Sequence, residues 1–300
     1  MPESNAIIES DLLEKLERLT IHWQKSLPGL VGGHNLSRIR GSGQEFLDHR
    51  HFHHGDDLRD VNWRAFLRLD KLFLKMFQLE PRVPVRILVD TSRSMLTGGE
   101  DGTSLNKFDY ARQLAAALCY VGLIRLDTMT IQPFSGKMGQ SLRAGGGRQR
   151  IQPVLRFLEG LKCGGQTNFM EVTREFMSTY EQRGVVIVIS DFLDDADCER
   201  PIQYLADFGH EVFLAHVWSE EDRVPPWDGD LDLEDAETGT HLQLPFGPDA
   251  RAAYTEAFDK FAASIKNIAL RNGGRYVAIS TATPIEDAVF GPFVRMGVLQ

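Results

Sequence analysis

The chain has 300 residues, of which 42% are hydrophobic and 25% are charged. This length predicts one large domain or two modest ones, and the composition excludes collagen-like, disordered and coiled-coil proteins. The net charge of −9 is concentrated in residues 219–237, where nine acidic residues accompany a single arginine. Binding to nucleic acid through bulk charge is therefore not expected.

The sequence also bears on the compartment. Its three cysteines, Cys119, Cys163 and Cys198, are odd in number and widely scattered, which is typical of a reducing environment and not of a disulfide framework. The longest apolar run, residues 114–124, is shorter than the ~20 residues that a bilayer span needs. The N-terminus is acidic where a signal peptide would be basic. We expect a cytoplasmic protein without membrane insertion.

The first 82 residues predict two parts. Residues 7–27 carry leucines at helical spacing, and Pro28 ends the pattern, so an amphipathic helix is expected within a first segment of residues 1–29. Residues 30–82 contain scattered glycines between short apolar pieces, which predicts irregular backbone with a few short strands. The last of these strands is expected at residues 72–79.

From residue 83 the sequence alternates between strand and helix patterns. This alternation predicts a Rossmann-like α/β domain over residues 83–300, with a mostly parallel sheet and helices on both faces. An acidic insertion at about residues 219–246 interrupts it and is expected to form a hairpin around residues 237–239. The expected strands are residues 85–89, 128–134, 139–143, 185–189, 212–217 and 276–279, and the expected helices are residues 107–126, 151–161, 169–180, 202–208 and 249–270.

Oxygen-bearing side chains follow the most apolar strands. Asp90, Ser92 and Ser94 come after residues 85–89, Asp191 comes after residues 185–189, and Thr167 lies on a glycine-containing loop between them. Ligands bind at the carboxyl ends of such strands, and these hard oxygen donors suit Mg²⁺, or Ca²⁺ or Mn²⁺, better than Zn²⁺. Gly164 and Gly165 would let the loop approach closely. The alternative is that Asp90 and Ser92 only cap the next helix.

The motif D-x-S-x-S, followed by a threonine and an aspartate, resembles the metal-ion-dependent adhesion site of von Willebrand factor A domains. The matching residues are Asp90, Ser92, Ser94, Thr167 and Asp191. The resemblance implies that the hydroxyls hold the ion while the aspartates act largely through water. It also implies an open coordination position that accepts a glutamate or aspartate from a partner protein.

The preceding segments, residues 33–46 and 50–64, resemble the signature of a bacterial family filed as domain of unknown function fifty-eight. That resemblance implies an association with MoxR-class AAA+ ATPases. Asn62 departs from the family pattern, in which an aspartate usually precedes the tryptophan. Many relatives carry membrane helices, and this chain resembles the branch without them.

Other residues in the signature allow two interpretations. His49, His51 and His53 alternate and could imitate a zinc site, although no glutamate base or cysteine stands at a typical spacing beside them. Trp63 and Phe66 are expected in a core, and Cys163 is expected to be an inert thiol. Four arginines and three aspartates are expected to form ion pairs that hold this segment against the neighbouring sheet: Arg50, Arg59, Arg64, Arg68, Asp56, Asp57 and Asp60. The alternative is that the arginines bind an acidic surface of a partner.

These patterns favour a non-enzymatic adaptor that presents Mg²⁺ to an acidic side chain of a MoxR-type ATPase or of a client protein. No residue is assigned a catalytic or organic-cofactor role. A Mg²⁺-dependent phosphoester hydrolase, with Asp194 or Asp195 as general base, is the alternative. A third hypothesis is that the metal site is vestigial and residues 30–80 alone bind the partner. The acidic residues 219–237 are expected to form a solvated loop, with a cation trap or partner surface as alternatives.

Overall fold

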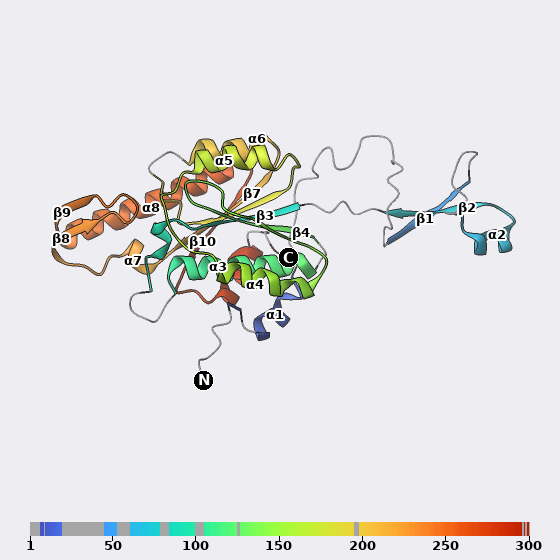
Figure 1. Ribbon diagram of the computed structural model, residues 1–300, viewed down its shortest axis with the longest axis horizontal. Helices are drawn as coiled ribbons and strands as arrows, with labels where there is room; N and C mark the ends of the chain where they lie inside the picture. The colour runs from blue at the N-terminus through green and yellow to red at the C-terminus, as the bar shows by residue number, and fades with distance from the viewer. Residues whose placement is uncertain are drawn as a thin grey trace. The chain divides into compact units, whose positions relative to one another are not determined.

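The computed structural model divides the chain into two compact units, Met1–Ser26 together with Val83–Gln300, and Leu27–Arg82 (Figure 1). The N-terminal helix thus belongs to the large unit. The structure describes residues 7–8, 10–19, 45–52, 61–78, 84–99, 105–124, 127–194, 198–295, 297 and 299.

The large unit is built on a six-stranded sheet with the order β10-β7-β6-β3-β4-β5. Every neighbouring pair is parallel except β4 and β5, which are antiparallel. The expected α/β architecture with a mostly parallel sheet is therefore confirmed. The strands are β3 (Pro84–Asp90), β4 (Thr128–Phe134), β5 (Leu142–Ala144), β6 (Val185–Ser190), β7 (Glu211–Trp218) and β10 (Arg275–Ser280).

Helices cover both faces of this sheet because successive strand side chains point to opposite faces. Val185 and Ile187 of β6 pack into one core with α1, α3, α4 and α9, whereas Val186 and Val188 pack into the other with α5, α6 and α8 (Figure 1). Among the helices that the structure describes, none is long and apolar enough to cross a bilayer. The helices are α1 (Ser10–Leu16), α3 (Lys107–Ile124), α4 (Ile151–Glu159), α5 (Phe169–Thr179), α6 (Glu199–Asp207), α8 (Pro248–Arg271) and α9 (Ile285–Ala288), with short 3₁₀ or π turns at Arg93–Leu96 (η2), Arg148–Arg150 (η3) and Val289–Phe293 (η4).

The N-terminal helix is shorter than expected. It ends at Leu16, and a tighter turn follows in which Leu19 N–H donates to the Leu16 carbonyl at 3.1 Å. This turn buries both Leu16 and Leu19 in the core of the large unit. The sequence predicted the same burial from a helix that continues past Leu16. Residues 20–27 of the expected helix lie outside the described residues.

The small unit consists of an antiparallel pair and a short helix. The elements are β1 (Glu45–His51), α2 (Trp63–Leu69) and β2 (Phe73–Gln78). Helix α2 was not expected; Asn62 caps it by accepting the Ala65 N–H, and Asp70 ends it at φ +52°. The expectation that Trp63 is a core residue is wrong, since its side chain is 53% exposed on this seven-residue helix.

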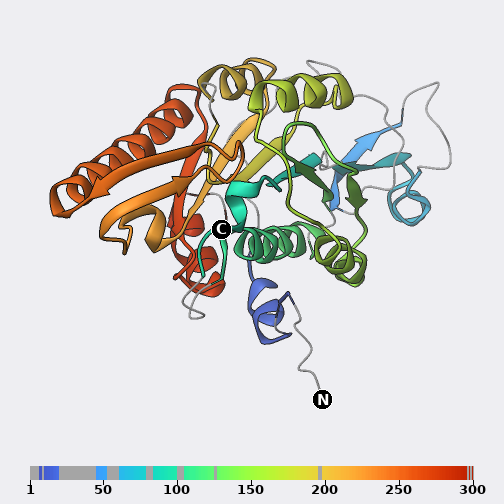
Figure 2. The same ribbon diagram turned by 60° about the vertical axis from the view of Figure 1, so that its left-hand side comes forward.

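The acidic insertion forms α7 (Glu220–Arg223) and the predicted hairpin, β8 (Gly229–Glu234) paired with β9 (His241–Phe246). Figure 2 shows the hairpin running beside α8. Its base is anchored by Phe246, which is buried beneath the guanidinium of Arg251. Most side chains of residues 219–237 are exposed, as expected for a solvated segment, but their backbone forms α7 and β8 and is not only a loop.

Candidate functional site

The site lies where the strand order of the sheet reverses. The chain passes from β3 to β4 on one side and later returns to β6 on the other side of β3. Such a reversal opens a crevice at the carboxyl ends of the two strands. Asp90 ends β3 and Ser190 ends β6, and the pairing of Val89 with Ile189 sets these two ends side by side.

The Asp90 carboxylate is fully buried in this crevice. Its Oδ1 accepts the Ser92 N–H at 2.8 Å and its Oδ2 accepts the Ser190 hydroxyl at 2.5 Å. Burial, and after it the charge of Asp191, raises the pKa of Asp90 to about 7, although both hydrogen bonds act in the opposite direction. Asp90 is therefore a carboxylate whose negative charge lacks compensation.

Two serine hydroxyls adjoin this carboxylate. Ser92 Oγ and Ser94 Oγ lie 2.9 Å apart, and both side chains are buried. Ser92 is the N-cap residue that precedes η2, but its side chain makes no capping hydrogen bond. The interpretation of Asp90 and Ser92 as helix caps is thus not supported at Ser92, whose hydroxyl faces Ser94 instead.

The loop that carries Thr167 is tied to the loop after β3 through the backbone. Gly164 N–H donates to the Thr91 carbonyl at 2.7 Å, and Arg93 N–H donates to the Gly165 carbonyl at 3.2 Å. The expected role of Gly164 is wrong, because a Cβ there would meet nothing within 4 Å. Gly165 is the position that needs glycine, since its φ is +86° and a Cβ would lie 3.3 Å from Ser135 Oγ.

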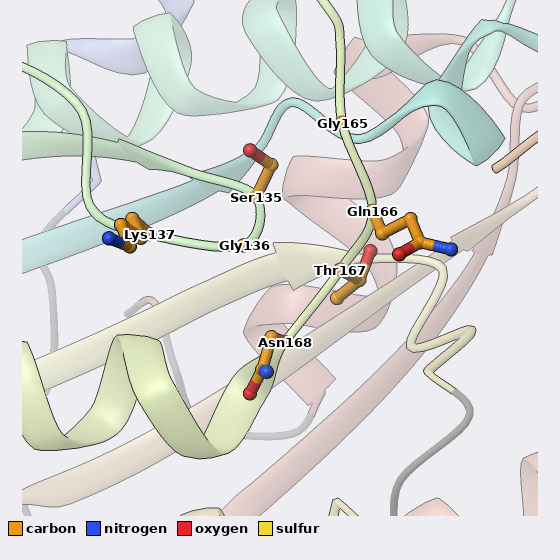
Figure 3. A pocket seen from close by; sticks show the side chains of 7 residues that line it. All are labelled: Ser135, Gly136, Lys137, Gly165, Gln166, Thr167 and Asn168. Carbon is orange, nitrogen blue, oxygen red and sulfur yellow. The ribbon is translucent and has the colours of Figure 1, made fainter. Parts of the chain in front are cut away.

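Thr167 is held by the hairpin. Its N–H donates to Glu237 Oε2 at 3.0 Å and its hydroxyl to Glu237 Oε1 at 3.1 Å. Beside this loop is an open hollow of about 450 Å³, lined by residues 135–137 and 165–168. In Figure 3 Gln166 and Thr167 extend from the loop, while Lys137 on the facing turn points away from them. The hollow gives solvent access to the loop of Thr167.

Asp191 binds a buried lysine. Lys107 Nζ lies 2.8 Å from Asp191 Oδ2 and 3.2 Å from Asp222 Oδ2, and the Lys107 side chain is 1% exposed. Burial lowers the pKa of Lys107, but the charges of Asp191 and Asp222 outweigh burial, so the pKa lies above its ordinary value. The ammonium therefore stays charged and compensates these two carboxylates together.

The loop after β6 is joined to the start of α5. Phe192 has a φ of +57°, and its ring stacks on that of Phe169 with centroids 5.6 Å apart. Asp194 Oδ2 accepts the Phe169 N–H at 2.9 Å. Asp194, the suggested base of a hydrolase, is thus engaged at the first turn of α5, and Asp195 lies outside the described residues.

The structure brings the five predicted ligands to one edge of the sheet but pairs them differently. Asp90, Ser92 and Ser94 form one hydrogen-bonded group, Asp191 acts on Asp90 through its charge, and Thr167 bonds to Glu237. Sequence reasoning missed Ser190, Lys107, Asp222 and Glu237. Lys107 carried a signal, because it lies on the buried face of α3 with Tyr110, Ala111 and Leu114.

The other expected sites contribute less. His51 is exposed and packs its ring near Phe73, His53 lies outside the described residues, and no cluster of three His, Cys, Asp or Glu side chains suited to a metal occurs in the described part of the chain. Burial, followed by the charge of Asp90, raises the pKa of the Cys163 thiol to about 12, so it is protonated at neutral pH. Residues 53–60, which hold most of the expected charge network, are outside the described ranges.

Comparisons with known proteins find a family and several similar chains. Residues 48–264 match the model of a family described as "Protein of unknown function DUF58". An uncharacterized protein of Mycobacterium tuberculosis is 26% identical over 255 residues, which is 84% of this chain and 79% of that protein. Among solved structures, conserved hypothetical protein BatB from Bacteroides thetaiotaomicron is similar (16% identity, 71% of this chain and 98% of that chain, TM-score 0.42). A von Willebrand factor type A protein from Catenulispora acidiphila is also similar (12% identity, 75% and 43%, TM-score 0.40).

Proposed function

This chain belongs to the DUF58 family, and from that premise we propose that it is a non-enzymatic protein-interaction module that binds an acidic side chain of a partner through Mg²⁺. Asp90, Ser92, Ser94, Thr167 and Asp191 would hold the ion, directly or through water. The ion supplies an electrophilic open position. The protein supplies the buried oxygens that fix it at the edge of the sheet.

The single observation that carries the proposal is the 2.9 Å separation of Ser92 Oγ and Ser94 Oγ. Mg²⁺ binds oxygens octahedrally at about 2.0–2.1 Å, so two adjacent ligands stand about 2.9 Å apart. Ca²⁺ binds oxygens at about 2.3–2.6 Å with more ligands, which also brings neighbouring oxygens close together. The two hydroxyls are therefore spaced as adjacent ligands of one divalent cation.

The charge distribution supports the same proposal. Lys107 serves Asp191 and Asp222 together, and Asp90 has no cationic partner among the described residues. A buried carboxylate near a second one is costly unless a cation accompanies it. A divalent cation between Asp90 and Asp191 would remove that cost.

The proposed partner is a MoxR-type AAA+ ATPase, or a client protein delivered to it, and this step depends on the family resemblance of residues 33–64. The test is binding of the purified ATPase to the full chain in Mg²⁺ and in EDTA. Binding is expected in Mg²⁺ only, and Asp90→Asn and the double variant Ser92→Ala, Ser94→Ala are expected to abolish it. Asp207→Asn, which changes a charge on α6, is the matched control.

A second mode of partner binding, which needs no metal, has one observation in its favour. Lys107 already neutralises Asp191, so this part of the site is stable without a metal ion. In that mode α2 would bind the partner through Trp63 and Leu67, whose side chains are 53% and 83% exposed. Binding that ignores Mg²⁺ and Asp90→Asn, but is lost in Trp63→Ala, would support this mode and reject the metal-dependent one.

A further inference from the structure

The hairpin places a carboxylate of this chain on the candidate metal site. Both Glu237 oxygens accept hydrogen bonds from Thr167, one from the backbone N–H and one from the hydroxyl. Glu237 is half-buried, whereas the residues on either side of it in the turn are exposed. The two residues are 70 positions apart in sequence, so this contact depends on how the hairpin docks.

The turn is built to present this one acid. Asp235 Oδ1 accepts the N–H groups of Glu237 and Thr238 at 2.9 and 2.7 Å, and Gly239 completes the turn at φ +70°. These bonds fix the backbone that carries Glu237. Among the hydrogen bonds described, only those of Glu237 connect the turn to the loop of Thr167, so the docking of the turn on this loop depends on the carboxylate.

We propose that Glu237 is an internal acidic ligand that closes the metal site, and that a partner binds by displacing it. This inference rests on the proposed function, because it concerns the same site. The group that Glu237 brings to Thr167 is the group that a partner would bring. The hairpin therefore competes with the partner for the site.

A tethered ligand competes at a high effective concentration, on the order of millimolar for a short flexible connection. A lone external carboxylate of equal intrinsic affinity must exceed that concentration before it enters. The partner that fits this site is consequently a folded protein that adds contacts beyond its acid, and a short acidic peptide would bind poorly.

The experiment uses Mn²⁺ as the ion and acetate as the carboxylate probe, with the full chain as wild type, Glu237→Gln and Glu234→Gln. The control Glu234→Gln removes an equal charge from the exposed end of β8. Water proton relaxation measures how many exchanging water molecules each bound Mn²⁺ carries. Glu237→Gln is expected to show higher relaxation than the other two proteins. Acetate is expected to lower that relaxation at a concentration roughly tenfold below the one the wild type needs.

The possible results distinguish failure of the Glu237 inference from failure of the proposed metal-dependent function. If all three proteins bind Mn²⁺ with equal relaxation and equal response to acetate, the internal-ligand inference is overturned and the metal-dependent function stands. If none of them binds Mn²⁺, the proposed function fails and the inference fails with it. An equal rise in both variants would also overturn the inference, since it would show an effect of hairpin charge and not of Glu237.

Discussion

Lys107 and Asp191 form an ion pair that is buried at the candidate metal site. The two atoms, Nζ and Oδ2, are 2.8 Å apart, and the side chains are 1% and 3% exposed. A pair so deeply buried is stable only while both partners are present, because removing one leaves an uncompensated charge. The pair also puts a positive charge next to the proposed Mg²⁺ position, so the two cations act on the same carboxylates.

The variant Lys107→Met tests this relationship. In EDTA it is expected to lower the free energy of unfolding by about 3–5 kcal/mol, because Asp191 loses its buried partner. Mg²⁺ is expected to recover more stability in the variant than in the wild type. Urea denaturation with and without Mg²⁺ measures both effects, and Lys260→Met, at an exposed pair with Glu256, is the control. A loss of the same size with and without Mg²⁺ would contradict the shared role.

Two adjacent glycines offer a matched pair of variants. Gly165→Ala is expected to lower the free energy of unfolding by about 1–2 kcal/mol, because φ +86° is unfavourable for alanine. It is also expected to weaken Mg²⁺ binding, because the loop of Thr167 shifts. Gly164→Ala is expected to be neutral, since its Cβ meets no atom within 4 Å. Denaturation and calorimetric Mg²⁺ titration check both variants. Equal behaviour of the two would show that the loop backbone is not constrained at Gly165.

Ser190 supports the buried carboxylate of Asp90 at a 2.5 Å hydrogen bond. Ser190→Ala is expected to raise the pKa of Asp90 further, because the lost bond favoured the charged form. The variant is also expected to lower the free energy of unfolding by about 1.5–3 kcal/mol above pH 7, where the carboxylate is ionised. Carboxyl NMR titration and denaturation of the metal-free protein measure these effects. Ser264→Ala on the surface of α8 serves as control, and an unchanged Asp90 titration would refute the role of Ser190.

His210 makes stability depend on pH at the opposite end of the sheet. Burial, followed by the charge of Arg86, lowers its pKa to about 4. The unfolded chain then binds more protons than the folded protein, so stability is full above about pH 6.5 and is lost as the pH falls toward 4, by about 3 kcal/mol at most. His210→Asn keeps an acceptor for the Gly184 N–H and is expected to remove the share of this loss that His210 causes. A second share remains, because burial also lowers the pKa of His216 to about 4.

Denaturant melts at pH 7 and pH 4.5 give the His210 contribution as the difference between wild type and variant. His241→Asn, which removes an exposed imidazole on β9, is expected to follow the wild-type curve. If His210→Asn loses as much stability as the wild type between these two pH values, His210 makes no contribution to the pH dependence.

The sequence was informative where structure is local. The β-branched runs of β3 and β6 predict buried parallel strands, and the alternate spacing of Asp90, Ser92 and Ser94 predicts their contact, because a few bonds of backbone determine both. Helix α2 escaped prediction because the glycines upstream of it, the last of which is Gly55, favoured irregular backbone for the whole of residues 30–82. The partner of Thr167 was not predictable either: Glu234, Asp235 and Glu237 carry the same charge in sequence, and only the docked turn distinguishes them.

The stacked rings of Phe169 and Phe192 have a mechanical consequence. Phe169 immediately follows the loop of Thr167, and Phe192 immediately follows Asp191. The ring stack and the Asp194 bond to the Phe169 N–H therefore connect the two segments that carry proposed ligands. A displacement of Thr167 by a bound partner would move Asp191 as well, and through its ion pair it would move Lys107 at the start of α3, without a change in the sheet.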